Sequence, residues 1–347
     1  MPSANDRSKI SLKSGLSAWL TKMGAPLVVM LQIAVGGPQS NLFAANSAAQ
    51  ETGRNKSLEA DDQTFSPTAR ISASVGKGGK NEKQDVLLVK RLLSKFGYNL
   101  ALNGEADAAL NSAIGKFQAD YVPATKSDER IDPAGQTWNT LIGIGRVKGS
   151  LDELAKKYDL EPAVILAIQS VESGNNGYLP DGRPKILFEG HVFWRMLKAA
   201  GKNPADYVKG NEDILFEKQD RSKYTRGAAE YARLEKAEKI DRVAALKSAS
   251  WGEFQIMGFN HKTVGYPDVD SFVESIKQPG AGQIRAVLAF MDNNKLLPLV
   301  RGPHKNWAKF AAAYNGAGYK KNQYDVKLLK AYDRFSKISR TETTQLN

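Results

Sequence analysis

The clearest candidate for acid–base chemistry in this sequence is Glu172, near the end of the segment 162–174. Pro162 suits the first turn of a helix, and Gly174 suits the left-handed residue that follows one. The apolar residues between them fall on one helical stripe that should face a core: Val164, Ile165, Ile168 and Val171. Glu172 lies on that same stripe, at the C-terminal end of the predicted helix.

A carboxyl group in this position meets two unfavourable influences on its charge. Apolar neighbours desolvate it, and the negative end of the helix macrodipole repels it. Both influences raise the pKa of the carboxyl group, as a general acid that works near neutral pH requires. The alternative is a helix-end glutamate that turns outward to solvent.

Two further carboxylates follow Glu172. Asp181 lies in the polar, glycine-rich stretch 173–184, which is long enough to border a cleft. Its Asp-Gly pair is also a common turn former. Glu189 lies between the apolar, strand-like run 185–188 and a predicted helix from His191, where the helix dipole alone would favour an acid.

Hydrogen-bonding side chains recur among apolar and small residues in two later segments. Ser250 and Gln255 lie in the segment 249–258, which we interpret as a cleft wall or as a tightly packed helix capped by Ser250. The segment 307–318 predicts a small-residue helix that ends at Tyr314 and Asn315, although Asn-Gly commonly just terminates helices.

Composition places these residues in an ordinary globular protein. The chain has 347 residues, enough for two domains and tails, with 41 % hydrophobic and 25 % charged residues. A net charge of +12 favours an anionic partner or surface, either nucleic acid or the bacterial envelope. No basic run is interleaved with stacking aromatics, so we expect no nucleic-acid partner.

Metal and cofactor chemistry has little support in the residue types. The absence of cysteine excludes disulfides, thiol catalysis and Cys-based zinc sites. Three scattered histidines predict no metal site, and no cofactor is expected: His191, His261 and His304.

Residues 1–49 follow the layout of an export signal, with a basic region, an apolar run at 25–35 and small residues at 43–49. The apolar run is too short to span a bilayer stably, and a disordered tail is the alternative. Residues 50–70 are polar and poor in aromatics, as in a linker. An exported, periplasmic or secreted protein is therefore expected.

Residues 71–145 predict three short helices around one small core. Asp85 is expected to cap the first helix, the second runs over about 106–119, and Asp132-Pro133 opens the third. No cluster of acids or histidines occurs here, which favours a binding module over a catalytic one.

The motifs Asp85-Val-Leu-Leu-Val-Lys-Arg-Leu-Leu93, Ala113-Ile114-x-x-Phe117-Gln118 and Pro133-x-x-x-Thr137-Trp138 resemble the peptidoglycan-binding type 1 domain. The loop before Asp132 is longer than that family usually has, and an unrelated three-helix spacer is the alternative.

Residues 148–340 form the second predicted unit. Helices are expected at 151–158 and 162–172, and the charged segment 221–241 predicts an amphipathic helix or helix pair with a solvated charged face. The motifs around Glu172-Ser173, Leu179-Pro-Asp-Gly-Arg-Pro-Lys-Ile-Leu-Phe-Glu189, Ser250-Trp-Gly-x-Phe-Gln-Ile-Met257 and Tyr314-Asn315 resemble the N-acetylmuramidase family of phage endolysins and bacterial effectors. The resemblance implies a mostly α, lysozyme-like fold with Glu172 as catalytic acid and peptidoglycan glycan strands as substrate.

Two reactions fit that resemblance, both at the β-1,4 bond between N-acetylmuramic acid and N-acetylglucosamine. A hydrolase needs a second group, for which Glu189 is the first candidate and Asp181 the second. A lytic transglycosylase needs none, because the muramyl 6-hydroxyl attacks internally. In either reaction four side chains would orient the sugars: Ser250, Gln255, Tyr314 and Asn315.

A wall-binding protein without catalysis is the alternative from another class. A phage lysin, an autolysin and a secreted antibacterial effector would share these two units. The sequence carries no indication of oligomeric state.

Overall fold

The computed structural model describes residues 65–122, 127–172, 177–278, 281–316 and 318–345. The predicted export signal and most of the predicted linker lie outside the described residues. Residues 65–70 of that linker pack on the protein: Phe65 is buried, and the Arg70 guanidinium donates to the carbonyl oxygens of Leu179 and Pro180. Within the described ranges, no helix combines the length and apolarity that a membrane crossing needs.

The first unit contains three helices and a two-stranded antiparallel sheet. The helices are α3 (Lys83–Ser94), α4 (Ala108–Tyr121) and α5 (Gln136–Lys148), and the strands are β1 (Val75–Gly76) and β2 (Arg130–Ile131). The three predicted helices are present, but α5 begins at Gln136, so the prediction that Asp132-Pro133 opens it is wrong, and the helix is not short.

The predicted cap of the first helix is wrong. The helix begins at Lys83, so Asp85 lies in its first turn, where its carboxylate accepts hydrogen bonds from the backbone N–H groups of Ser72 and Ala73. Asp107 instead caps α4 by accepting from the Leu110 N–H at 2.7 Å.

The second unit is also mostly helical, as predicted. The helices α6 (Leu151–Tyr158) and α7 (Pro162–Glu172) have the bounds that the sequence indicates. The later helices are α8 (Gly190–Ala199), α9 (Ala229–Lys247), α10 (Val269–Lys277), α11 (Gly282–Asn293), α12 (Trp307–Asn315), α13 (Tyr319–Asn322) and α14 (Tyr324–Gln345). Asp241 interrupts α9 with a non-helical backbone, so the segment is a kinked pair of helices.

A small antiparallel sheet lies among these helices, in the strand order β3 (Ile186–Phe188), β4 (Ala249–Trp251) and β5 (Ile256–Met257). The helix considered for 249–258 is therefore wrong. Gly252 and Gln255 both have positive φ, +73° and 49°, which a helix cannot contain but a tight hairpin turn can.

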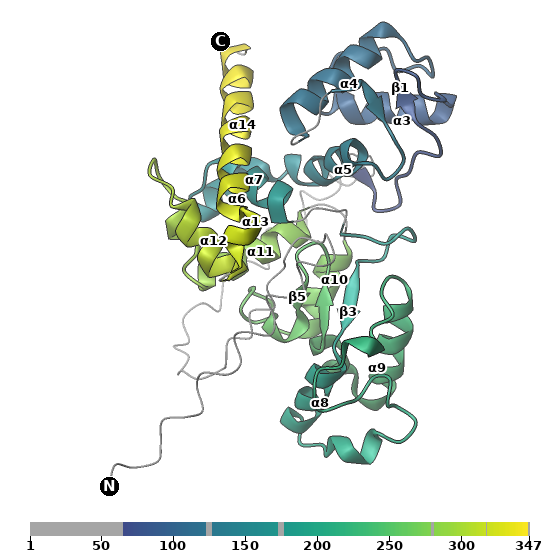
Figure 1. Cartoon of the computed structure of the whole chain (residues 1–347), viewed down its shortest axis with the longest axis vertical. Helices are drawn as coiled ribbons and strands as arrows, with labels where there is room; N and C mark the ends of the chain where they lie inside the picture. Colours follow the sequence, from purple (N-terminus) through teal and green to yellow (C-terminus); the bar gives the residue numbers. More distant parts are fainter. Residues whose placement is uncertain (1–64, 123–126, 173–176, 279–280, 317, 346–347) are drawn as a thin grey trace, which may run out of the picture.

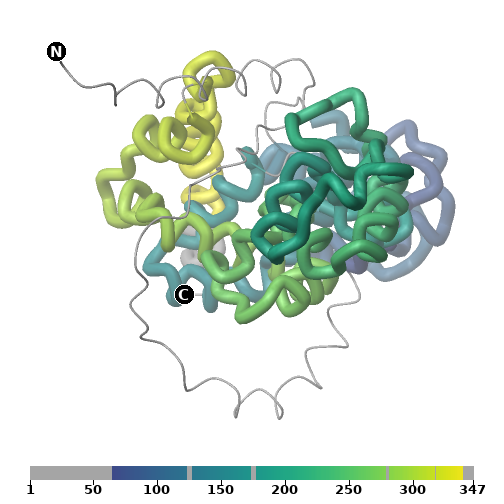
Figure 2. The backbone as a smooth tube through the Cα atoms, turned by 90° about the horizontal axis from the view of Figure 1, so that it is seen from below, coloured from purple at the N-terminus to yellow at the C-terminus, as the bar shows by residue number. Residues whose placement is uncertain are grey.

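The two units pack against each other along α14 and α5 (Figure 1). The Phe335 ring of α14 lies 6.1 Å from the Tyr121 ring of α4, and Gln169 of α7 donates to the Gly143 carbonyl oxygen of α5 at 2.9 Å. Figures 1 and 2 both place α8 and α9 away from α14, and Figure 1 shows the small sheet between them. One continuous set of buried apolar side chains runs through both units.

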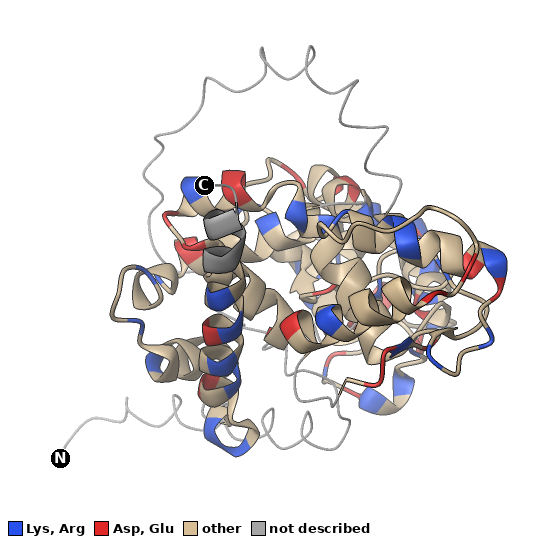
Figure 3. Ribbon diagram, turned by 90° about the horizontal axis from the view of Figure 1, so that it is seen from above, with Lys and Arg blue, Asp and Glu red and all other residues tan. Residues whose placement is uncertain are grey.

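Basic and acidic residues are interspersed over most of the described elements (Figure 3). The chain's net charge of +12 gives a general attraction to anionic material.

Candidate active site

Glu172 occupies the last position of α7, and its side chain has no solvent-exposed surface. The helix packs against α5, α6 and α14. The coreward orientation predicted from the apolar stripe is thus what the structure shows, and the alternative of an outward-facing glutamate is wrong.

Asn315 is the hydrogen-bonding partner of Glu172. Its Nδ2 atom donates to both carboxyl oxygens, at 3.2 and 3.0 Å, although the two residues are 143 positions apart. Asn315 ends α12, where the sequence predicts a helix end, and it is itself buried. Tyr314 beside it is buried as well. The structure therefore brings three of the predicted site residues together.

Burial raises the pKa of Glu172 to about 8, while the Asn315 hydrogen bond and the Lys327 charge act in the opposite direction. The carboxyl group is therefore mostly protonated at neutral pH, because desolvation penalises its charged form. Burial also raises the pKa of the Tyr314 hydroxyl, and the nearby Glu172 charge adds to this effect.

We expect Asn315→Ala to move the alkaline limb of the pH–rate profile to higher pH. The Asn315 amide stabilises the ionised carboxylate, so its loss raises the pKa of Glu172 above the value of about 8. The measurement is kcat/KM on soluble glycan strands between pH 5 and 10, with Asn322→Ala on α13 as the control. An unmoved alkaline limb in Asn315→Ala would contradict this assignment.

Glu189 lies in a second buried polar cluster. Its Oε2 atom accepts a short hydrogen bond from the Tyr224 hydroxyl and lies 3.3 Å from His191 Nδ1, while its Oε1 atom has no partner among the described residues. Burial raises the pKa of Glu189. Burial together with the Arg195 charge lowers the pKa of His191 to about 4, so His191 is neutral at pH 7.

Near Glu189 lies a buried ion pair that the sequence pattern does not predict. Arg233 donates from Nη1 to Glu230 at 2.7 Å and to the Phe188 carbonyl oxygen at 2.9 Å, and both charged side chains are almost completely buried. Glu230 also accepts from the Phe188 backbone N–H at 3.0 Å. The solvated face predicted for the charged segment 221–241 is wrong at these positions. A buried helix face could have been inferred from the apolar residues nearby in the sequence, namely Tyr231, Leu234 and Ala237.

Asp181 has the contacts of a turn residue. Its carboxylate accepts from the Arg183 backbone N–H at 3.0 Å and from the Arg183 guanidinium at 2.9 and 2.7 Å. These hydrogen bonds lower the pKa of the exposed Asp181 carboxyl group, so it is ionised at neutral pH.

Ser250 and Gln255 are joined to each other within the small sheet. The Ser250 hydroxyl donates to Gln255 Oε1 at 2.9 Å, and Gln255 Nε2 donates to the carbonyl oxygens of Gly252 at 2.8 Å and Lys185 at 3.3 Å. These bonds fasten the hairpin turn to the start of β3. The polar side-chain groups of Ser250 and Gln255 are thus hydrogen-bonded within the protein.

The predicted site residues fall into separate hydrogen-bonded groups. Among the hydrogen bonds and ion pairs of the described residues, none joins Glu172 to Glu189, Asp181, Ser250 or Gln255. The same described residues contain no group of three or more acids and histidines arranged to hold a metal ion.

Comparisons with known proteins agree with this fold. A model of the N-acetylmuramidase family matches residues 161–336, which is half of the chain. The crystal structure of a Burkholderia AP3 phage endolysin is similar over 76 % of this chain and 99 % of its own, with 37 % sequence identity and a TM-score of 0.54. Among curated proteins, none matches.

Proposed function

The chain belongs to the N-acetylmuramidase family and is a glycoside hydrolase, and from that premise we propose that it cleaves the β-1,4 bond between N-acetylmuramic acid and N-acetylglucosamine, with Glu172 as general acid. The observation that carries the proposal is the buried carboxyl group of Glu172, whose pKa of about 8 keeps it protonated at neutral pH.

In this mechanism Glu172 gives its proton to the glycosidic oxygen as the bond breaks and positive charge develops at the anomeric carbon. The Asn315 amide then donates hydrogen bonds to the carboxylate that remains. It thereby limits the cost of leaving a buried charge and keeps the carboxyl group in one orientation. Tyr314 and Asn315 are also our candidates for orienting the sugar.

A hydrolase needs a second group that stabilises the developing charge or activates water. We keep Glu189 as the first candidate because one of its carboxyl oxygens has no partner among the described residues. Asp181 comes second because Arg183 engages both of its oxygens. Ser250 and Gln255 are proposed to shape the cleft wall through the hairpin that they fasten.

We further propose that the first unit, residues 71–145, holds the enzyme on peptidoglycan. The similarity to the endolysin covers 76 % of the chain, more than the half that the family model matches, so it extends beyond the catalytic unit. The net charge of +12 would add attraction to an anionic wall, which weakens as salt screens it. The enzyme would act on the cell wall as a phage lysin or as an exported bacterial enzyme.

The products of digestion test the proposed reaction. We expect mass spectrometry of fragments released from purified peptidoglycan to show reducing N-acetylmuramic acid ends, since water attacks the anomeric carbon in hydrolysis. Anhydromuramyl ends would instead assign the chain to transglycosylation. Release of no fragments, with binding retained, would favour the wall-binding alternative.

A further inference from the structure

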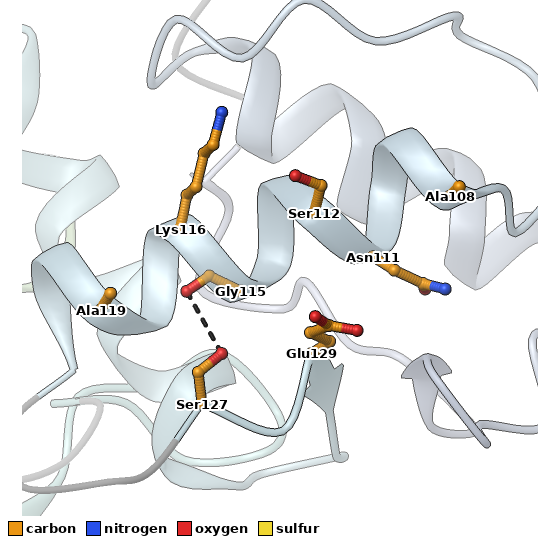
Figure 4. A pocket seen from close by; sticks show the side chains of 8 residues that line it. All are labelled: Ala108, Asn111, Ser112, Gly115, Lys116, Ala119, Ser127 and Glu129. Carbon is orange, nitrogen blue, oxygen red and sulfur yellow. Dashed lines mark hydrogen bonds between the residues drawn. The ribbon is translucent and has the colours of Figure 1, made fainter.

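An open groove with a volume of about 450 Å³ lies on the first unit, between α4 and the segment that leads into β2 (Figure 4). One wall is α4, which presents small and polar side chains: Ala108, Asn111, Ser112, Gly115, Lys116 and Ala119. Ser127 and Glu129 form the other wall. A volume of this size is in the range of roughly 300–1,000 Å³ that small-ligand pockets have.

The second wall is held in place by Gln118, a buried residue of α4. Its Oε1 atom accepts from the backbone N–H groups of Asp128 and Glu129, at 3.1 and 3.0 Å, and from the Ser127 hydroxyl at 3.0 Å. Its Nε2 atom donates to the Arg130 carbonyl oxygen at 2.9 Å. One side chain thus satisfies the polar groups of the facing segment, so the groove is formed before any ligand arrives.

Gly115 sets the distance between the two walls. A methyl group at this position would lie 3.1 Å from Glu129 Cγ and 3.3 Å from the Ser127 hydroxyl oxygen. The Ser127 hydroxyl also donates to the Gly115 carbonyl oxygen at 3.3 Å. The absence of a side chain at 115 therefore lets the facing segment lie close to the helix backbone, which forms the floor of the groove.

Opposite charges flank this floor. Lys116 and Glu129 project on opposite sides of it in Figure 4. Glu129 pairs with Lys77 at 3.4 Å, but both side chains are well exposed, at 39 and 69 %, and such pairs are weak enough for a ligand cation to replace. Asn111 also lines the groove, but its Oδ1 atom is buried and has no hydrogen-bond partner among the described residues.

We propose that this groove binds a short peptide that carries both a carboxylate and an ammonium group, the chemical class of a peptidoglycan stem peptide that contains a diamino acid. Lys116 would take the carboxylate and Glu129 the ammonium group. None of the groove's described lining residues is aromatic, so it lacks the flat apolar faces on which sugar rings stack. The assignment rests on the wall-binding role proposed above for the first unit.

Calorimetric titration of the full-length protein with synthetic L-alanyl-γ-D-glutamyl-diaminopimelic acid tests the assignment. We expect Ala119→Trp to abolish binding by filling the groove, whereas Ala109→Trp, on the same helix but outside the groove, leaves it unchanged. Lys116→Met and Glu129→Gln should each weaken binding by about fivefold, the scale of one partly exposed ion pair. Wild-type protein that fails to bind the peptide, or Ala119→Trp that binds it normally, would overturn the assignment.

A parallel titration with peptide-free glycan strands, in the Glu172→Gln background to prevent cleavage, separates glycan from peptide. We expect Ala119→Trp to leave glycan binding unchanged, and weakened glycan binding would assign the groove to sugar instead. The peptide titration involves no cleavage, so its result stands even if Glu172 is not the general acid. Equal far-UV circular dichroism spectra of wild type and Ala119→Trp would show that the variant is folded.

Discussion

Glu172→Gln is expected to lower kcat on purified peptidoglycan by about 10²–10⁴-fold, the contribution typical of a positioned general acid. Glutamine preserves the shape of the side chain and can still accept the hydrogen bond from Asn315, but it has no proton of suitable acidity to give. The measurement is the loss of turbidity of a wall suspension, together with the initial rate on soluble glycan strands.

Glu153→Gln is the matched control, because Glu153 is exposed on the neighbouring helix α6. We expect it to clear the wall at the wild-type rate. Equal clearing by Glu172→Gln and wild type would remove Glu172 from its proposed role.

Glu172→Gln should also have a higher free energy of unfolding than wild type, and the difference should grow as pH rises. Burial raises the pKa of Glu172 in the folded protein from the ordinary value of 4.5 to about 8, so the fold binds its proton more tightly than the unfolded chain does. Its contribution to stability is complete below pH 4.5 and is lost between about 4.5 and 8. Since one pKa unit corresponds to about 1.4 kcal/mol, the loss is on the order of a few kcal/mol.

Urea unfolding of both proteins at pH 5 and pH 8 measures this difference. Glutamine carries no ionisable proton, so the free energy of unfolding of Glu172→Gln should exceed that of wild type far more at pH 8 than at pH 5. An advantage that does not change with pH would mean that the pKa of Glu172 is not raised.

The second large effect is expected at the buried pair of Glu230 and Arg233. Arg233→Met should lower the free energy of unfolding by about 3–5 kcal/mol, because it leaves the Glu230 carboxylate buried without its countercharge. It also removes the donors to the carbonyl oxygens of Phe188 and Asp213. Phe188 ends β3 and precedes Glu189, so the loss reaches the start of α8.

Lys236→Met is the control for this change. Lys236 lies on the same helix and pairs with Asp213, but both side chains are exposed, and such a pair contributes less than about 1 kcal/mol. The double variant Glu230→Gln/Arg233→Met should recover part of the loss, because the unpaired charge is gone. Equal urea midpoints for Arg233→Met and Lys236→Met would show that the buried pair contributes little.

The helices α6 and α7 could be predicted to their end residues from the sequence. Their limits depend on local signals, namely Pro162 at a helix start and the apolar period of the residues that follow. The same apolar period predicted that the Glu172 side chain faces the core, because positions four residues apart share one helix face.

Local signals failed where distant segments determine the structure. The segment 249–258 is a hairpin because β4 pairs with β3, some sixty residues earlier in the chain, as in the register Leu187↔Ser250. Glu230 and Arg233 looked like solvent-exposed helix charges, yet the backbone groups of β3 satisfy them in the interior. Neither outcome is visible in periodicity, which reports on neighbours within one or two helical turns.

The sequence by itself thus determined the mostly helical architecture and the position of one carboxyl group on an apolar helix face. The tertiary structure alone decided the chemistry of that group. The fold removes Glu172 from water, and α12 brings in Asn315 from 143 residues away. Because desolvation depends on everything that surrounds a carboxyl group, its raised pKa is a property of the assembled fold.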